Sequence, residues 1–146
     1  MTDAARILLV EDNPTDAELA RRALNKIGLS GQVCCVRDGE EALDFVFARG
    51  AYSERVAGEG LRVILLDLKL PKVDGLEVLK QVKGDPRTRG IPVVMLTSSK
   101  VPADVEACYR AGANSYIVKP VDFAGHAQVL KNLGVYWTRL NVERGG

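Results

Sequence analysis

The sequence predicts one α/β domain built around a doubly wound, parallel sheet of five strands. Its length of 146 residues fits a single hydrophobic core, because folded domains most often have about 100 to 150 residues. Short apolar runs alternate along the chain with segments whose apolar residues recur at helical spacing. Apolar strands that alternate with helices are typical of a parallel sheet covered by helices on both faces.

Five apolar runs are the expected strands, and a helix follows each of them. The strands lie at residues 7–10, 33–36, 63–66, 93–96 and 116–118, and the helices at 15–27, 40–48, 76–82, 105–111 and 123 to about 140. Right-handed connections leave few topologies for such a chain, and we expect the flavodoxin-like strand order 2-1-3-4-5.

Turn residues mark the ends of these elements. Pro14 follows the first strand at a good helix start, and Gly28 is a favoured helix stop. The third helix ends at Asp85 and the fourth at Gly112. Between about 50 and 61, glycines and scattered charges without a period predict an extended surface loop inside the domain.

The charge balance excludes two classes of partner. The 20 basic and 19 acidic residues leave a net charge of +1, so the chain lacks the cationic excess that direct nucleic acid binding or adhesion to a membrane needs. No apolar run approaches the roughly 20 residues that span a bilayer. Without a secretory signal, the expected compartment is the cytoplasm. The single histidine, His126, lies in a polar stretch and is expected to be exposed.

Polar residues follow four of the strands at the point where each strand ends. Glu11 and Asp12 follow the first strand, Asp67 the third, Thr97 the fourth and Lys119 the fifth. Loops are polar in general, which explains any one of these residues but explains the set poorly. Strands one and three are neighbours, and three close carboxylates stay ionised together only with a cation nearby. Oxygen ligands without histidine or cysteine select Mg²⁺ or a similar ion such as Mn²⁺.

This group of residues favours phosphoryl transfer. Three carboxylates, one divalent cation and the Lys119 ammonium give a site that is about neutral and tolerates an incoming phosphoryl anion. A carboxylate is a recognised phosphoryl acceptor, and a cation, an ammonium and a hydroxyl can share the transferred charge. Asp67, which is central in the sheet, is the expected nucleophile.

Four motifs resemble the receiver domains of two-component response regulators, and the match covers nearly the whole chain. They are Leu-Leu-Val-Glu-Asp-Asn at 8–13, Ile-Leu-Leu-Asp-Leu at 64–68, Leu-Thr-Ser at 96–98 and Tyr-Ile-Val-Lys-Pro at 116–120. The resemblance implies that Glu11 and Asp12 bind a metal ion. It implies further that Asp67 is both metal ligand and phosphoryl acceptor, and that the main-chain carbonyl of Lys69 is another ligand.

The same resemblance assigns roles to residues outside the acidic cluster. It implies that Thr97 donates a hydrogen bond to the phosphoryl group and that Lys119 pairs with it. Tyr116 matches the switch aromatic of the family, which we expect to turn when Thr97 moves toward the phosphoryl group. The resemblance also implies that the peptide bond before Pro120 is cis.

A narrower resemblance points to the stand-alone regulators associated with bacterial and cyanobacterial phytochromes. It rests on the long loop, on Thr-Ser-Ser-Lys at 97–100 and on the aromatic pair Tyr136 and Trp137. The implied partners are a sensor histidine kinase of the bacteriophytochrome type and a downstream phosphotransfer protein. Lys69 departs from this subgroup, which more often has asparagine there, so the lifetime of the phosphate stays open.

The last helix carries an apolar stripe that predicts a homodimer. The stripe consists of Leu130, Leu133, Trp137 and Leu140, with Tyr136 beside it. Because the stripe extends beyond the length that short strands cover, we expect its distal half to be buried against a second copy. The expected contact residues are Trp137, Tyr136 and Leu140. The alternative is that the whole stripe packs on the sheet.

Three other functions use similar residues. A magnesium-dependent phosphohydrolase of similar fold needs a second acid two residues past its nucleophile, where this chain has Lys69. A nucleotide-binding flavodoxin-like protein needs a glycine-rich first turn, whereas this turn is acidic and begins with Glu11. A phosphorelay carrier without an output of its own is also open.

Overall fold

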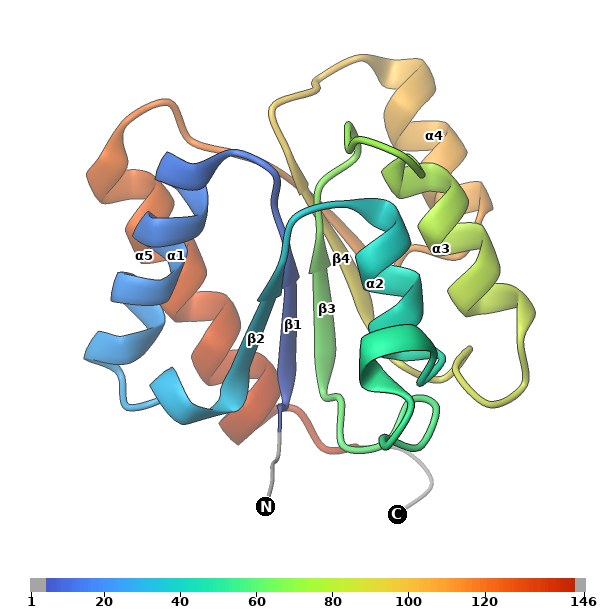
Figure 1. The fold of residues 1–146 in the computed structure, drawn as a ribbon. Helices are drawn as coiled ribbons and strands as arrows, with labels where there is room; N and C mark the ends of the chain where they lie inside the picture. The colour runs from blue at the N-terminus through green and yellow to red at the C-terminus, as the bar shows by residue number, and fades with distance from the viewer. Residues whose placement is uncertain (1–4, 144–146) are drawn as a thin grey trace.

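The computed structural model describes residues 5–143 of the chain. It contains one parallel sheet whose five strands follow the order β2-β1-β3-β4-β5, which confirms the predicted topology (Figure 1). The strands are β1 (Ile7–Val10), β2 (Val33–Val36), β3 (Val63–Leu66), β4 (Val93–Thr97) and β5 (Ser115–Val118).

Helices cover both faces of the sheet (Figure 1). One face carries α1 (Pro14–Lys26) and α5 (Phe123–Val135), and the other carries α2 (Gly39–Val46), α3 (Gly75–Gly84) and α4 (Pro102–Arg110). Two short 3-10 turns lie at Ser30–Gln32 and Gly50–Tyr52. No helix within residues 5–143 is long and apolar enough to cross a bilayer.

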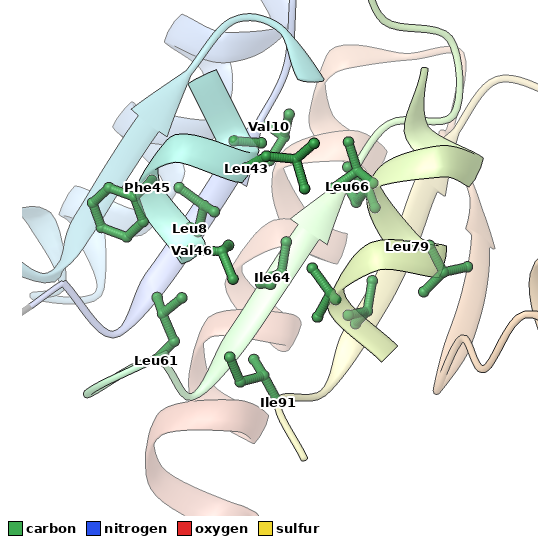
Figure 2. Packing of buried hydrophobic residues seen from close by; sticks show 14 of the residues in the cluster. Leu8, Val10, Leu43, Phe45, Val46, Leu61, Ile64, Leu66, Leu79 and Ile91 are labelled. Atoms are coloured by element: carbon green, nitrogen blue, oxygen red, sulfur yellow. The ribbon is translucent and has the colours of Figure 1, made fainter. Parts of the chain in front are cut away.

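Side chains of the central strands alternate between two hydrophobic cores. Leu8 and Val10 of β1 belong to the core under α2 and α3, whereas Ile7 and Leu9 belong to the core under α1 and α5. Figure 2 shows the first core, in which side chains from β1, β3, α2 and α3 point toward one another. Each fully buried leucine or isoleucine stabilises the fold by about 1.5–3 kcal/mol. The ends of β1 and β3 are therefore held by packing on both faces.

Four of the helices begin at an asparagine or aspartate that caps the backbone. In each case the side chain accepts a hydrogen bond from the backbone N–H three residues further on, and the caps are Asn13, Asp38, Asp74 and Asp122. Replacing such a cap by alanine costs about 1 kcal/mol. The caps define where α1, α2, α3 and α5 begin after the loops at the carboxyl edge of the sheet.

Residues 50–61 are more ordered than the sequence suggests. The Tyr52 hydroxyl donates a hydrogen bond to Glu41 of α2 at 2.8 Å. The Arg55 guanidinium lies 3.7 Å from the centre of the Phe45 ring and also donates to the Phe45 carbonyl. The expected loop is thus held against α2 by side-chain contacts. Such contacts leave no periodic pattern in the sequence, so the sequence did not predict them.

The end of α5 is more enclosed than we expected. The helix continues into a π-helical turn at Tyr136–Leu140, and Leu130 is fully buried. Trp137 packs in part against the core under α1 and α5, because α5 stays packed along α1. Tyr136 and Leu140 are 45% and 66% exposed. The distal stripe is therefore open at Leu140 and partly covered at Trp137, and Tyr136 beside it is exposed.

His126 corrects a second expectation, because it is only 4% exposed. It lies near the start of α5, where the charges of Asp16 in α1 and of Lys119 act on it. The polar residues beside it in the sequence do not reveal this burial, which depends on how closely α5 approaches α1.

Candidate functional site

The three predicted acids meet at the carboxyl edge of the sheet. Glu11 and Asp12 follow β1 and Asp67 follows β3, and the register of these strands pairs Val10 with Leu66. One carboxylate oxygen from each acid lies within 4.8 Å of the others. Glu11 and Asp67 are buried, whereas Asp12 is exposed. The cluster is thus enclosed on one side and open to solvent on the other.

Lys119 reaches this cluster from the end of β5. Its ammonium nitrogen lies 2.7 Å from Glu11 Oε1, 3.0 Å from Asp67 Oδ2 and 3.1 Å from Asp16 Oδ2. The lysine side chain is only 8% exposed. Its backbone N–H donates to the carbonyl of Thr97 at 2.8 Å, which extends the hydrogen bonding between β4 and β5. Lys119 therefore joins the fifth strand to the acids of the first and third.

Asp16 is a member of the site that the sequence analysis missed. It lies in the first turn of α1, and its backbone N–H donates to the cap residue Asn13. The site thus holds four carboxylates and one ammonium, so the expected neutral balance with one divalent cation is wrong by one negative charge. The signal that could have found Asp16 is its place in the first helical turn after Pro14, directly beyond the acids.

Burial and charge act in opposite directions at the ion pair of Glu11 and Lys119. Burial raises the pKa of the Glu11 carboxyl, and the nearby ammonium offsets only part of that effect. Burial alone would lower the pKa of Lys119, but the hydrogen bond and charge of Glu11, with the charge of Asp67, outweigh it and raise that pKa. Lys119 therefore stays protonated in the buried site.

The donor set fits a hard divalent cation. The three clustered acids, Glu11, Asp12 and Asp67, offer only oxygen atoms, and Mg²⁺ and Mn²⁺ prefer such ligands over nitrogen or sulfur. The exposed carboxylate of Asp12 leaves a way in from solvent. Lys69 lines the same cleft, so its main-chain carbonyl stays a candidate ligand.

Thr97 and Tyr116 both contact Ser99, in the loop between β4 and α4. Thr97 is buried at the end of β4, and its hydroxyl oxygen accepts from the backbone N–H of Ser99 at 3.4 Å. The Tyr116 hydroxyl donates to the carbonyl of Ser99 at 2.9 Å. The Ser99 hydroxyl in turn donates to Asp104 of α4 at 2.6 Å. The two predicted switch residues are thus linked through one loop residue to the start of α4.

The predicted cis peptide bond before Pro120 is wrong. No peptide bond within the described residues is cis. Trans is the lower-energy form of a bond before proline by about 0.5–1 kcal/mol. In this trans conformation Lys119 already reaches three carboxylates, so its placement does not need the cis form.

The predicted catalytic and metal-binding residues line one open cleft of roughly 1000 Å³. Its lining includes Glu11, Asp12, Asp16, Asp67, Lys69, Thr97 and Lys119. Most of these residues lie in or beside the loops after β1, β3 and β4. These loops lie at the upper edge of the sheet in Figure 1. The candidate dimer residues Tyr136, Trp137 and Leu140 follow α5 and lie outside this cleft.

The chain matches the family model described as "Response regulator receiver domain" over residues 7–131. It belongs to this receiver family. The phosphohydrolase and nucleotide-binding alternatives are not favoured, because neither accounts for this match. Receiver domains are signalling domains, and this receiver has the strand order and acidic cluster described above.

This receiver is similar to several response regulators of known structure, two of which are phytochrome response regulators by name. The bacteriophytochrome response regulator AtBRR is 50% identical, with a TM-score of 0.72 over 97% of this chain and 100% of its own. The phosphorylated cyanobacterial phytochrome response regulator RcpA is 35% identical, with a TM-score of 0.89 over 98% and 100%. The Mn(2+)-bound form of response regulator Rcp1 is 33% identical, with a TM-score of 0.86 over 95% and 98%.

Another relative is named for a role in methanogenesis and not for a phytochrome. The probable methanogenesis regulatory protein FilR2 of Methanothrix harundinacea is 41% identical over 140 residues, which are 95% of this chain and 87% of FilR2. The receiver is thus similar to regulators with more than one named role.

Proposed function

We propose that Asp67 accepts a phosphoryl group from a sensor histidine kinase and that the receiver then changes its binding to partners. The observation that carries the proposal is the Asp67 carboxylate, which lies 3.0 Å from the Lys119 ammonium and beside two further acids in an open cleft. An oxygen of Asp67 attacks the phosphorus atom and forms a P–O bond. The P–N bond to the kinase histidine breaks, and the departing imidazole takes up a proton.

Glu11, Asp12 and Asp67 would hold Mg²⁺ or Mn²⁺, with the main-chain carbonyl of Lys69 as a further ligand. The bound ion supplies positive charge that offsets the carboxylates and the incoming phosphoryl oxygens. Rcp1 with Mn(2+) bound is a relative that supports this choice of cation. Lys119 and the hydroxyl of Thr97, which line the same cleft, would pair with the phosphoryl oxygens. By holding these groups, the receiver promotes its own phosphorylation and dephosphorylation.

Thr97 and Tyr116 form the element that responds to phosphorylation. When the Thr97 hydroxyl turns to the phosphoryl group, it releases the backbone N–H of Ser99, whose carbonyl holds Tyr116. Moving a population from 1:99 to 99:1 needs about 5.5 kcal/mol, more than one neutral hydrogen bond supplies. The charges of Lys119 and of the cation therefore contribute to the change.

The kinase in this proposal is of the bacteriophytochrome type. The phytochrome response regulators AtBRR and RcpA support it by their likeness over nearly the whole chain. We place the exchange in the cytoplasm, where histidine kinases draw on ATP. A downstream phosphotransfer protein is a second partner, because the aspartyl phosphate can pass its phosphoryl group to a histidine.

We propose further that the receiver forms a homodimer through the end of α5. Tyr136 and Leu140 are exposed apolar residues at this end, and Trp137 joins them to the core. Burying the two exposed side chains against a second copy would remove them from water.

Phosphotransfer from a purified bacteriophytochrome kinase tests the proposal. The kinase is autophosphorylated with radiolabelled ATP and mixed with wild type or Asp67→Asn, and a kinase without a chromophore domain is run in parallel. We expect rapid label on wild type from the phytochrome kinase and none on Asp67→Asn. Equal labelling of both chains would contradict the acceptor, and equal rates from both kinases would contradict the phytochrome assignment.

A further inference from the structure

Asp16 is the only one of the three carboxylate partners of Lys119 that lies outside the acidic cluster. Its Oδ2 atom is 3.1 Å from the ammonium nitrogen of Lys119. The other two partners, Glu11 and Asp67, belong to the cluster that can hold a metal ion. A cation bound there competes with Lys119 for the same oxygens and repels its ammonium. Among the described residues, Asp16 is then the carboxylate partner that Lys119 keeps.

The backbone of Asp16 is held in place independently of Lys119. The backbone N–H of Asn13 donates to Glu11 Oε2 at 3.1 Å, and the Asn13 side chain accepts from the backbone N–H of Asp16 at 3.0 Å. Pro14 begins α1 between these two hydrogen bonds. Lys119 closes the ring by bridging Glu11 and Asp16. These hydrogen bonds hold the backbone of Asp16 at the start of α1, so its carboxylate stays within reach of the lysine when a cation takes the other two acids.

We propose that Asp16 is a positioning residue, which keeps the Lys119 ammonium beside Asp67 when a cation occupies Glu11 and Asp67. This inference rests on the proposed role of Asp67 as phosphoryl acceptor. Lys119 is long and has many rotamers, and a nearby divalent cation pushes its charge away. A carboxylate outside the cluster, on a backbone held by the helix cap, offsets that repulsion, so the ammonium remains available to the phosphoryl oxygens.

A simple charge effect of Asp16 predicts the opposite result for an anion. A carboxylate that acts only through its charge repels the phosphoryl group, so its removal should strengthen the binding of a phosphoryl mimic. A carboxylate that positions Lys119 supports this binding, so its removal should weaken it. The sign of the change in affinity for an anion therefore separates the two roles.

Binding of beryllofluoride, a mimic of the phosphoryl group on aspartate, provides the test. Its affinity is measured by calorimetry at saturating Mg²⁺ for wild type, Asp16→Asn, Asp16→Glu and Glu18→Gln. Glu18→Gln is the matched control, because it removes the same charge from α1. Glu18 itself pairs with Arg21 and Arg22 on the surface and not with Lys119. We expect binding to Asp16→Asn to be about tenfold weaker, recovery in Asp16→Glu, and no change in Glu18→Gln.

The same substitution is then made in chains that lack the lysine. In a Lys119→Ala background, Asp16→Asn should have no further effect on beryllofluoride affinity, because Asp16 acts through the lysine. A further loss in that background would overturn the proposal.

Titration with Mn²⁺ alone gives a readout without any phosphoryl group. Asp16→Asn should bind Mn²⁺ several-fold more weakly when Lys119 is present, because the lysine then stays on Glu11 and Asp67, and the loss should be much smaller in the Lys119→Ala background.

The controls separate failure of this inference from failure of the proposed function. If wild type takes up beryllofluoride and Asp16→Asn binds it equally well or better, only the positioning role is wrong. If wild type does not bind beryllofluoride, or if Asp67→Asn binds it as well, the proposed acceptor fails and the role of Asp16 falls with it. Equal unfolding midpoints for wild type and Asp16→Asn would show that the fold is intact.

Discussion

At the scale of single residues, the proposed response to phosphorylation depends on two hydroxyl groups that share one loop residue. Thr97 and Tyr116 are held by the backbone N–H and the carbonyl of Ser99, respectively. A movement of the Thr97 hydroxyl would therefore shift Ser99 and so change the hydrogen bond of Tyr116, without a direct contact between the two side chains.

Thr97→Ala should keep phosphorylation of Asp67 but weaken the response of Tyr116. The substitution removes one hydrogen bond of about 1 kcal/mol, which lowers the equilibrium constant for the switched state roughly fivefold. NMR signals of Tyr116 with and without beryllofluoride measure the response. The control is Ser98→Ala, which removes an exposed hydroxyl from the same cleft. A full response of Tyr116 in Thr97→Ala would refute the coupling.

The buried His126 should make the fold less stable in mild acid. Burial lowers the pKa of this imidazole below its ordinary value of 6.5, the charge of Lys119 acts in the same direction, and Asp16 opposes them. As the pH falls below 6.5, His126 becomes protonated in the unfolded chain but stays neutral in the folded chain. The free energy of unfolding then declines by up to about 1.4 kcal/mol per pH unit until the folded pKa is reached.

Urea unfolding between pH 5 and 7.5 measures this decline, with His126→Asn as the control that cannot titrate. The free energy of unfolding of wild type should fall relative to the variant on going from pH 7.5 to 5. Parallel pH profiles, or an imidazole pKa at or above 6.5 by NMR, would show that burial does not govern this residue.

At the scale of elements, residues 50–61 are held to α2 by Arg55. Its guanidinium stacks on Phe45 and donates to the backbone carbonyls of Phe45 and Glu59. Hydrogen bonds from a charged donor and a cation–π contact each contribute on the order of 1–2 kcal/mol.

Arg55→Ala should lower the free energy of unfolding by about 2 kcal/mol and speed amide exchange in residues 50–61. Arg49→Ala is the matched control, because this arginine lies at the same end of α2 but is exposed and paired loosely with Asp44 at 3.9 Å. Its effect should stay within about 0.5 kcal/mol. Exchange rates that rise equally in both variants would mean that Arg55 does not hold residues 50–61 against α2.

The strands and the main acids follow from the sequence, whereas contacts between distant side chains do not. Continuous apolar runs fix β1 and β3, and the residues directly after them have to meet at one edge of a parallel sheet. The signal of Asp16, its place in the first helical turn, is weaker, because the helix dipole alone already favours an aspartate there. Its link to Lys119 joins residues 103 positions apart. The burial of His126 likewise depends on the packing of α5 against α1.

At the scale of the whole molecule, the exposed side chains of Tyr136 and Leu140 after α5 bear on assembly. We expect wild type to sediment as a dimer at tens of micromolar and phosphorylation to change its affinity or geometry. Leu140→Ser should weaken the dimer about tenfold, because it removes apolar area from the contact. Trp137→Ala should weaken it too, but it also disturbs the core against which Trp137 packs.

Val142→Ser is the control for this experiment, because Val142 is 89% exposed and lies outside the stripe. It should sediment like wild type. A wild-type chain that stays monomeric at tens of micromolar, with and without phosphorylation, would remove the homodimer from the account.

The central claim is that Asp67 accepts a phosphoryl group with the help of a divalent cation. Intact mass spectrometry after incubation with acetyl phosphate tests it most directly, with borohydride reduction to locate the acyl phosphate. We predict one added phosphoryl group on Asp67 in the presence of Mg²⁺, and none after chelation or in Asp67→Asn. A phosphoryl group that forms without a divalent cation, or that appears on another residue, would contradict the account.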